Sequence, residues 1–469
     1  MKVVLIRPPR PISDTHFISL QFPLNLGYIA SFLRERGYDL EIWDYEVENL
    51  TEEGLHRKIR QANPGLIGIT CLTPTVIGAH KIASLIKKMS RDILIVAGGA
   101  HPTVLPTETL NEFPDFDMAV IGEGEETLLE ILRYLKEKRS FSGIRGIAYR
   151  EKNGAVKIEN PRPYFEDINL LPFPARNLVD QNLYRGHHVS RGFSRQFLKV
   201  SEIITSRGCP YNCIFCVCHN RKTLFRNIDN VLAEIDDCIT RYNTSHFSFL
   251  DDTLTMNPKH ITELCKGLNR FKKITWDCFA RVDTVSLEIL KEMAQSGCRK
   301  ISYGVESGSP RILNLIKKNI KLEQVRNAFV WSREAGIEYI EGSFMIGCHP
   351  NENRQDIDMT IKIIYELEPD ILMLSIMIPY PGTEVYKIMK EKRYLSEGIR
   401  WDDFVFFTYK PAWRIDFFSS GQLFDIHRNL LRRFYLRPKY IFKILRKIKN
   451  WNELLYWIDE GTDFIRRII

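Results

Sequence analysis

Residues 205–216 read TSRGCPYNCIFC, and this stretch decides how the second half of the chain is interpreted. Cys209, Cys213 and Cys216 lie at Cys-x3-Cys-x2-Cys spacing on a loop after a predicted strand at 202–205. Three soft sulfur ligands on one short loop suit an iron–sulfur cluster. Structural zinc normally takes four protein ligands, and the usual paired Cys-x2-Cys arrangement is missing. A cluster is therefore the favoured interpretation, with zinc or incidental cysteines as the alternative.

The cysteine spacing resembles that of the radical S-adenosylmethionine (SAM) superfamily. This resemblance implies a [4Fe-4S] cluster on the three cysteines, with the open iron binding the amino and carboxylate groups of SAM. Reductive cleavage of SAM would then give a 5′-deoxyadenosyl radical. Phe215, inside the motif, is expected to contact SAM, whereas Cys218 is not expected to be a ligand.

Strand-like and helix-like segments alternate on both sides of this loop as far as about residue 378. From the motif onward, we predict strands at 202–205, 247–250, 274–279, 300–305, 339–346 and 372–378. The helices between them are predicted at 226–241, 258–270, 286–295, 322–335 and 354–366. This order predicts a partial (β/α)6 barrel, although periodicity alone does not separate it from a second open sheet.

The resemblance places SAM-binding residues at the ends of these strands. Asp251 and Asp252 end the second strand, where an acid suits the amino group of SAM, and a helix cap is the alternative. Arg281, after the third strand, is expected to contact the SAM carboxylate unless it forms a surface salt bridge. Glu306 and Ser307 end the fourth strand and are expected to face the methionine or ribose part of SAM.

The loop after the fifth strand departs from the family pattern. Residues 344–351 read FMIGCHPN, where relatives commonly have Gly-Leu-Pro-Gly-Glu-Thr, so the adenine-side contacts stay open. Cys348 and His349 either touch substrate or, in the favoured interpretation, are a packed cysteine beside an exposed histidine.

The first 140 residues alternate in the same way and predict a Rossmann-like, doubly wound parallel sheet. Predicted strands lie at 3–7, 40–43, 66–71, 93–97 and 118–121, and predicted helices near 25–36, 52–61, 76–88, 104–112 and 125–137. A hairpin around Asn153-Gly154 and a proline-rich connector follow. The predicted domains are 1–140, a connector at 141–198, the barrel at 199–395 and a helical aromatic and basic region at 396–469.

A Rossmann-like domain ahead of a radical SAM barrel resembles the cobalamin (B12)-binding branch of the superfamily. By that resemblance, turn 70–75 lies beneath the corrin, turn 98–103 surrounds the nucleotide tail and turn 122–125 closes the rim. Glycines let the backbone approach a large ligand and helix N-termini suit its phosphate, although an unrelated nucleotide site would look similar. The predicted cobalamin-binding residues are Thr70, Leu72, Thr73, Thr75, Gly98, Gly99, His101, Pro102, Gly122, Glu123 and Gly124.

Two interpretations stay open for the lower face of the cobalt. His16 lies in an Asp-x-His sequence, as in many cobalamin domains, but Ser19 replaces the family's glycine. The favoured interpretation has no histidine ligand and places Leu72 or a neighbour over that face, which would make cobalt a readier methyl donor. The methylthiotransferase branch is excluded, because its second cluster needs three more cysteines and only Cys71 precedes Cys209.

The charge of the chain is concentrated near its C-terminus. The 469 residues are 44% hydrophobic and 26% charged, which is ordinary for a globular protein, and the net charge is +8. No acid interrupts the basic residues Arg428, Arg432, Arg433, Arg437, Lys439, Lys443, Arg446, Lys447 and Lys449. The near-neutral remainder argues against nucleic-acid binding. Residues 428–449 form either a solvated basic helix or a contact with an anionic partner or a peripheral membrane surface.

These patterns predict a cobalamin-dependent radical SAM methyltransferase that acts on an unactivated carbon through the 5′-deoxyadenosyl radical and methylcobalamin. An oxidative cyclase or ring-rearranging enzyme with the same cofactors is the alternative, and a non-enzymatic cobalamin sensor is the alternative of another class. The expected partners are an electron donor such as flavodoxin or ferredoxin and a natural-product, lipid or tetrapyrrole substrate. Without a signal peptide or a membrane-length apolar run, a cytoplasmic location is expected.

Overall fold

The computed structural model describes residues 1–11, 20–184, 199–218, 221–405 and 410–448, together with 451, 454–455, 457–458 and 461–462. The chain divides into two compact units. The first comprises Met1–His16, Leu20–Tyr184 and Arg400–Val405, and the second comprises Phe17–Ser19, Arg185–Ile399 and Phe406–Ile469. A short piece of the predicted C-terminal region, 396–469, therefore belongs to the first unit.

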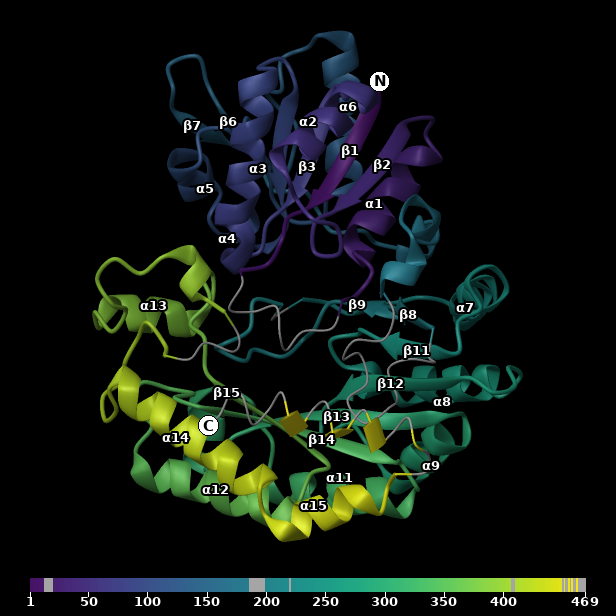
Figure 1. Ribbon diagram of the computed structural model, residues 1–469, viewed down its shortest axis with the longest axis vertical. Coiled ribbons are helices and arrows are strands. Elements are labelled where there is room, and N and C mark those ends of the chain that lie inside the picture. The colour runs from purple at the N-terminus through teal and green to yellow at the C-terminus, as the bar shows by residue number, and fades with distance from the viewer. Residues whose placement is uncertain are drawn as a thin grey trace. The chain divides into compact units, whose positions relative to one another are not determined.

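The first unit is built on a seven-stranded sheet in the order β2-β1-β3-β4-β5-β6-β7 (Figure 1). Its parallel strands are β1 (Lys2–Arg7), β2 (Asp39–Asp44), β3 (Leu66–Thr70), β4 (Leu94–Gly98) and β5 (Met118–Val120). The predicted doubly wound sheet is confirmed. The predicted hairpin, β6 (Ile147–Arg150) and β7 (Val156–Ile158), extends the same sheet, because β6 pairs antiparallel with the open edge of β5.

Helices connect the parallel strands of this unit. They are α1 (Leu24–Arg34), α2 (Glu52–Ala62), α3 (Val76–Met89), α4 (Ala100–Val104), α5 (Pro106–Glu112) and α6 (Glu125–Glu137). The helix predicted at 104–112 is α5, but the helical backbone is interrupted at Leu105 and the preceding residues form a separate helix, α4, that was not predicted. Pro106 disfavours helical backbone in the residue before it, so α4 ends and α5 starts anew with the proline in its first turn.

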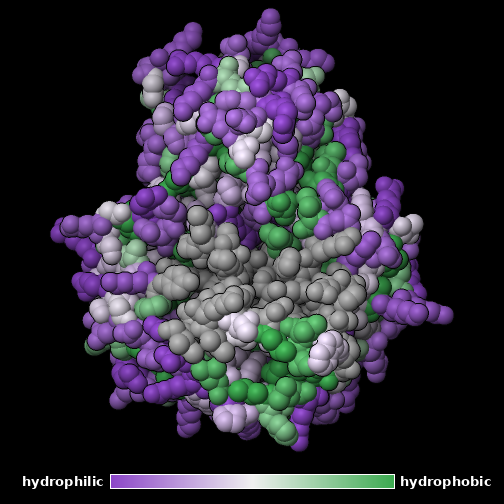
Figure 2. Space-filling view, in the orientation of Figure 1, coloured by the Kyte–Doolittle hydropathy of each residue, from purple (hydrophilic) through white to green (hydrophobic). Residues whose placement is uncertain are grey.

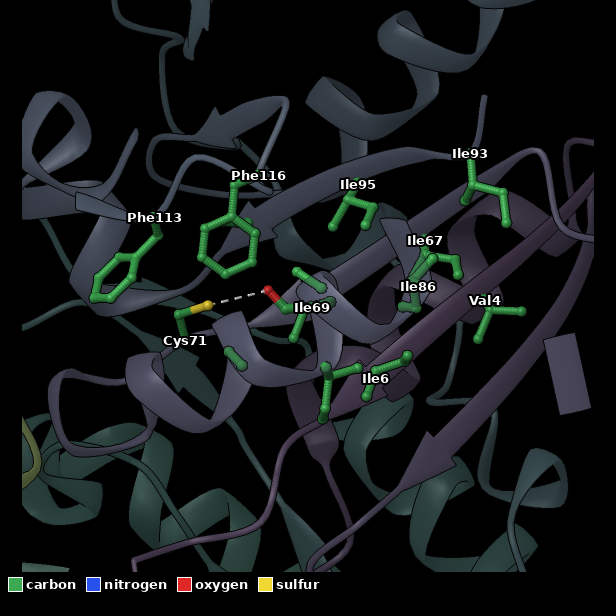
Figure 3. Packing of buried hydrophobic residues seen from close by; sticks show 14 of the residues in the cluster. Val4, Ile6, Ile67, Ile69, Cys71, Ile86, Ile93, Ile95, Phe113 and Phe116 are labelled. Carbon is green, nitrogen blue, oxygen red and sulfur yellow. Dashed lines mark hydrogen bonds between the residues drawn. The ribbon is translucent and has the colours of Figure 1, made fainter. Parts of the chain in front are cut away.

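The central strands β1, β3 and β4 are buried on both faces, as their continuous apolar sequences require, and Figure 3 shows one of the clusters in which they pack. Val4, Ile6, Ile67 and Ile95 are fully buried in one cluster with side chains of α2 and α3. Cys71 directly follows β3, and its thiol donates a 3.5 Å hydrogen bond to the carbonyl of Ile69. This cysteine is therefore a packing residue.

The second unit is built on a six-stranded, all-parallel sheet in the order β15-β14-β13-β12-β11-β8. The strands are β8 (Val200–Ile203), β11 (His246–Phe249), β12 (Thr275–Ala280), β13 (Cys298–Glu306), β14 (Tyr339–Ile346) and β15 (Ile371–Ile376). Because consecutive strands are neighbours, every connection advances by one position, as in the predicted partial (β/α)6 barrel. The connecting helices are α7 (Ile228–Tyr242), α8 (Pro258–Leu268), α9 (Leu287–Gln295), α10 (Pro310–Leu315), α11 (Leu322–Glu334) and α12 (Arg354–Leu367).

The two faces of this sheet differ in polarity. Tyr303 packs against Phe329 of α11 with ring centroids 5.5 Å apart, which identifies the helix-covered face. Residues alternate between faces along a strand, so the opposite face carries a polar layer. In that layer Nε2 of His246 lies 2.8 Å from Oδ2 of Asp277, and Lys300 pairs with Glu341 at 3.5 Å. The apolar strand pattern did not predict this layer.

After β15 the chain continues through α13 (Glu384–Glu391), and α14 (Ser420–Tyr435) and α15 (Pro438–Leu445) follow. The side chains of Tyr435 and His427, both on α14, bond to the backbone of edge strand β15. The presence of α14 and α15 confirms the predicted helical character of the C-terminal region over these two helices. Within the part of the chain that the structure describes, no helix combines the length and the apolar character that crossing a bilayer requires.

Candidate active site

The cysteine loop follows β8 and is held by backbone contacts on two sides. β9 (Ser206–Arg207) pairs antiparallel with β10 (Leu224–Phe225) at the start of the loop. Gly208 has φ +99°, and a Cβ there would lie 2.6 Å from the carbonyl oxygen of Lys222, so only glycine fits. Farther on, the amide of Ile214 donates to the carbonyl of Ile316 at 3.2 Å.

The three predicted ligands lie on this loop with different exposure. Cys213 is buried, Cys209 and Cys216 are half-buried and Cys218 is exposed. Burial raises the pKa of the Cys209 and Cys213 thiols, and the cations Lys318 and Arg281 oppose that rise at Cys213. A hydrogen bond with Cys218 raises the pKa of Cys216 and lowers that of Cys218.

Three thiols backed by two cations fit a cluster, because bound iron takes thiolates and the cations offset their charge. In the described residues, no three His, Cys, Asp or Glu side chains are gathered as a metal-binding set. Three thiolates repel one another, so the sulfurs are held close together only when the positive iron ions of a cluster are bound between them. Ligation by Cys209, Cys213 and Cys216 therefore stays a prediction.

Asp251, at the end of β11, is turned into the protein and anchors the start of the cysteine loop. Its carboxylate accepts hydrogen bonds from the amide of Thr205 at 3.0 and 3.1 Å, the hydroxyl of Thr205 at 2.8 Å and the hydroxyl of Ser206 at 2.5 Å. Nε2 of His260 lies 3.0 Å from the same Thr205 hydroxyl. Because that hydroxyl already donates to Asp251, His260 must be the donor. The neighbouring Asp252 is exposed.

A charged group lies behind the loop, where the ends of β12 and β13 meet the segment after α10. Arg281 forms a two-bond ion pair with Asp283, with both distances 2.9 Å, and donates to the carbonyl of Lys318 at 2.9 Å. Its guanidinium lies 3.6 Å from the ring centroid of Tyr211, within the cysteine motif. Nζ of Lys318 donates to Oε1 of Glu306 at 2.9 Å, and both side chains are largely buried.

The backbone at the end of β13 is shaped to hold this pair. Glu306 has φ +71°, which is unusual for a residue with a Cβ, and the register with β14 shifts between Gly304 and Glu306. A Cβ at Gly304 would lie 2.6 Å from Oε1 of Glu306 and 2.9 Å from Nζ of Lys318. The missing side chain at position 304 thus leaves the space that the ion pair occupies.

The structure brings together some of the predicted SAM-binding residues. Arg281 and Glu306 share the charged group beside the cysteine loop, and Phe215 lies half-buried within that loop. Ser307 is fully buried, with its hydroxyl 3.1 Å from that of Thr360 on α12. The SAM contacts of all six predicted residues stay predictions.

Sequence reasoning missed Lys318, which lies beyond α10 in the run IKKN at 316–319. A pair of adjacent lysines is typical of a solvated surface, and no local pattern marks one of them as buried. Cys348 is a packed cysteine, as the sequence analysis favoured. Its thiol lies 3.2 Å from the carbonyl of Met345, and its side chain is fully buried.

In the first unit, the carboxyl ends of β3, β4 and β5 form an edge that fits a large ligand. Gly99 has φ +101°, and a Cβ there would lie 2.9 Å from the carbonyl oxygen of Cys71, so only glycine fits this close approach. No atom lies within 4 Å of a Cβ built at Gly98 or Gly122, which leaves the backbone open at both turns. Leu72 leaves 49% of its surface exposed there, as expected of an apolar cover for cobalamin.

His101 is a fully buried polar side chain at this edge. Its Nδ1 lies 3.3 Å from the hydroxyl of Thr73, and its Nε2 has no hydrogen-bond partner among the described residues. Burial lowers the pKa of His101 to about 4, so the ring is neutral at pH 7. Trp401 stacks edge-on against it with centroids 4.9 Å apart, and the Trp401 indole donates to Glu112 at 2.6 Å.

The remaining predicted cobalamin residues shape the same turns. Thr75 bonds to the backbone of Leu72, and Glu123 accepts from the amide of Phe165 in the connector. Thr70, Pro102 and Gly124 lie on these turns, and Pro102 is buried. An open, glycine-lined edge with an exposed leucine and an unpartnered imidazole nitrogen fits cobalamin. His16 lies outside the described residues.

Comparisons with known proteins agree with both halves of the chain. The B12 binding domain family matches residues 17–132, and the Radical SAM superfamily matches residues 203–364. An uncharacterised methyltransferase of Pyrococcus horikoshii is 32% identical over 452 residues, which cover 94% of each chain. The anaerobic magnesium-protoporphyrin IX monomethyl ester cyclase of Rubrivivax gelatinosus is 25% identical over 450 residues, 94% of this chain and 78% of that protein.

A solved structure has the same fold along almost the whole chain. The cobalamin-dependent S-adenosylmethionine radical enzyme OxsB, solved with aqua-cobalamin and S-adenosylmethionine, superposes with a TM-score of 0.77 at 20% identity. The match covers 98% of this chain and 71% of that one. With a cobalamin domain and a radical SAM domain, and with a relative that is 32% identical nearly end to end, the protein belongs to the cobalamin-dependent radical SAM enzymes and uses cobalamin, SAM and a [4Fe-4S] cluster.

Proposed function

We propose that this enzyme methylates an unactivated carbon of a small-molecule substrate. The observation that carries the proposal is the charged group of Arg281, Glu306 and Lys318 directly behind the three-cysteine loop, in a chain with a glycine-lined cobalamin edge. When bound, the cluster and SAM supply the radical that removes a substrate hydrogen, and cobalamin supplies the methyl group.

The side chains of the second unit have separate tasks in this proposal. Cys209, Cys213 and Cys216 would hold the [4Fe-4S] cluster through their three thiolates, which would leave one iron free to bind SAM. The carboxylate of Glu306 suits the ammonium of the SAM methionine part, and the cations Arg281 and Lys318 suit its carboxylate. Because Lys318 and Glu306 are largely buried, their charges act in a medium that screens them weakly.

The proposal is tested with anaerobically reconstituted, full-length enzyme and SAM that carries a deuterated methyl group. Extracts of the organism that naturally makes this protein supply the substrate. The products of wild-type enzyme and of a Cys213→Ala control are compared by mass spectrometry. We expect a product one methylene unit heavier than its precursor that carries the label and appears only with wild-type enzyme. A new product without label would contradict methyl transfer.

An oxidative cyclase is the second candidate, because the Rubrivivax gelatinosus relative matches 94% of the chain and is named as a cyclase. The same experiment separates the two reactions. Cyclisation would give an unlabelled product lighter by two hydrogens and one molecule of 5′-deoxyadenosine for each turnover.

The substrate class and the electron donor are finer parts of the proposal. A tetrapyrrole, lipid or natural product is the proposed substrate, and the cyclase relative is named for a tetrapyrrole. Flavodoxin or ferredoxin is the proposed donor, tested by whether either replaces a chemical reductant in SAM cleavage. A cytoplasmic location and a contact of residues 428–449 with an anionic or membrane surface are likewise predictions.

A further inference from the structure

Exposed hydrophobic side chains are concentrated in one short part of the chain. Of the 18 large hydrophobic residues that are exposed among the described residues, seven lie between positions 436 and 458. Their exposed fractions run from 41% to 72%, and the residues are Leu436, Ile441, Phe442, Leu445, Trp451, Leu455 and Ile458. Scattered exposed hydrophobics are normal on a monomer, but several large ones on one helix face mark an interaction surface.

Helix α15 shows which of its faces the protein already uses. Tyr440 and Ile444 are each 6% exposed, and the Tyr440 hydroxyl donates to the carbonyl of Asp370 at 2.8 Å. Lys443 and Lys447 reach the Asp370 carboxylate at 2.8 and 2.7 Å. This inner face therefore packs at the start of β15, and two of the tail's basic residues are used in that contact.

The outer face of α15 is apolar with a cationic border. Ile441, Phe442 and Leu445 project from it, each about half exposed. The guanidinium of Arg446 lies 4.2 Å from the ring centroid of Phe442, and Arg433 is exposed on the preceding helix. In the orientation of Figure 1, Figure 2 shows hydrophobic residues gathered over the place that α15 occupies.

We propose that this outer face docks the enzyme on an anionic lipid bilayer, lying in the interface without crossing it. Interfacial helices combine a face of large apolar side chains with flanking Lys and Arg, and the Ile, Phe and Leu side chains of α15 with Arg433 and Arg446 have this composition. No acidic residue occurs from position 428 to 449 to repel lipid headgroups. The inward lysines both face Asp370, whose single carboxylate offsets one of their two positive charges, so the apolar side chains supply most of the affinity and the outward cations supply the preference for anionic lipid.

This surface does not depend on the reaction that the enzyme catalyses, so it can be tested without substrate. Full-length protein is floated with phosphatidylcholine vesicles that contain or lack phosphatidylglycerol. We expect the partition coefficient to be roughly tenfold higher on the anionic vesicles. The double substitution Ile441→Ser and Phe442→Ser should lower it by roughly tenfold or more, because two side chains that insert into the acyl boundary are lost.

Two matched variants separate this surface from general effects. Val330→Ser removes a side chain that is 56% exposed on α11 and should leave flotation unchanged. Arg433→Glu with Arg446→Glu leaves the apolar face and the inner contacts intact and should remove the preference for anionic vesicles. This charge reversal also tests the proposal if the serine variant fails to fold, which circular dichroism would show.

Three outcomes would overturn the proposal. One is equal flotation of wild type and the serine variant, and another is a charge reversal that leaves the lipid preference unchanged. The third is a dimer by light scattering that dissociates in the serine variant while wild type does not bind vesicles, which would make the face a contact between copies of this chain.

Discussion

Asp251 is a buried carboxylate whose hydrogen-bond donors are all neutral. Family resemblance predicts that it meets the amino group of SAM, but its oxygens are occupied by Thr205 and Ser206, directly before the cysteine loop. Burial raises the pKa of Asp251, and those hydrogen bonds oppose the rise. These contacts indicate that Asp251 positions the cysteine loop by holding its first residues.

Asp251→Asn tests that positioning role. The amide nitrogen cannot accept a hydrogen bond, so the Thr205 amide or a hydroxyl loses its partner, at a cost of about 1–3 kcal/mol. We expect reconstituted protein to hold less iron and sulfide, and the EPR signal of the reduced cluster to respond less to added SAM. Glu263→Gln, an exposed change on α8, is the control. An unchanged iron content and SAM response would contradict the prediction.

Glu352 is a second buried acid, and its contribution to the stability of the folded protein depends on pH. Its Oε2 accepts from the amide of Cys348 at 2.9 Å, while Oε1 has no partner among the described residues. Burial raises the pKa of Glu352 to about 8 from an ordinary value of 4.5. Between these values the folded protein holds a proton that the unfolded chain releases. The stability linked to this group is therefore present below pH 4.5 and is lost as the pH rises to 8.

Glu352→Gln removes this titration, because an amide stays neutral at every pH. We expect the variant to gain stability over wild type between pH 5 and pH 8, by up to about 4 kcal/mol. Urea unfolding of both proteins at the two pH values measures the difference. A constant difference across this range would show that Glu352 ionises without cost in the folded protein.

Among the elements, β15 is an edge strand whose exposed backbone is covered by α14. The Tyr435 hydroxyl accepts from the amide of Leu372 and donates to its carbonyl, both at 2.9 Å, and His427 donates to the carbonyl of Leu374 at 2.9 Å. An uncovered edge pairs readily with other chains. The helix thus protects the open side of the partial barrel through side chains.

Tyr435→Phe removes both bonds to Leu372 and leaves its amide and carbonyl unpaired. We expect a loss of about 1–2 kcal/mol in the free energy of unfolding and faster aggregation of the variant. Tyr440→Phe is the comparison, because it removes the hydroxyl that donates to the carbonyl of Asp370. The prediction fails if Tyr440→Phe destabilises the protein as much as Tyr435→Phe does, measured by denaturant titration.

For the whole molecule, the chain does not simply run through the first unit and then the second. Arg400–Val405 belongs to the first unit although the segments on either side of it belong to the second. Its Trp401 packs on His101, in the turn that family resemblance assigns to the nucleotide tail of cobalamin. This short piece of the C-terminal region is therefore part of the first unit.

Trp401→Ala should loosen this turn. It removes the edge-on contact with His101 and the hydrogen bond to Glu112, so we expect reconstituted protein to lose at least half of its cobalamin on gel filtration. Trp451→Ala, at a position that is 72% exposed, is the control and should retain cobalamin as wild type does. Absorbance of the eluted protein measures the retention. If both variants retained the same amount of cobalamin, Trp401 would not contribute to cobalamin binding.

By itself, the sequence determined the two parallel α/β sheets, their order along the chain and the family, because these depend on local periodicity and on the spacing of three cysteines within eight positions. Only the tertiary structure decided that Asp251 faces inward, that Lys318 joins Glu306 and that Trp401 returns to the first unit. These contacts join residues from 12 to 300 positions apart in sequence. A local pattern carries no information about such pairs, because burial and close packing bring them together only when the chain folds.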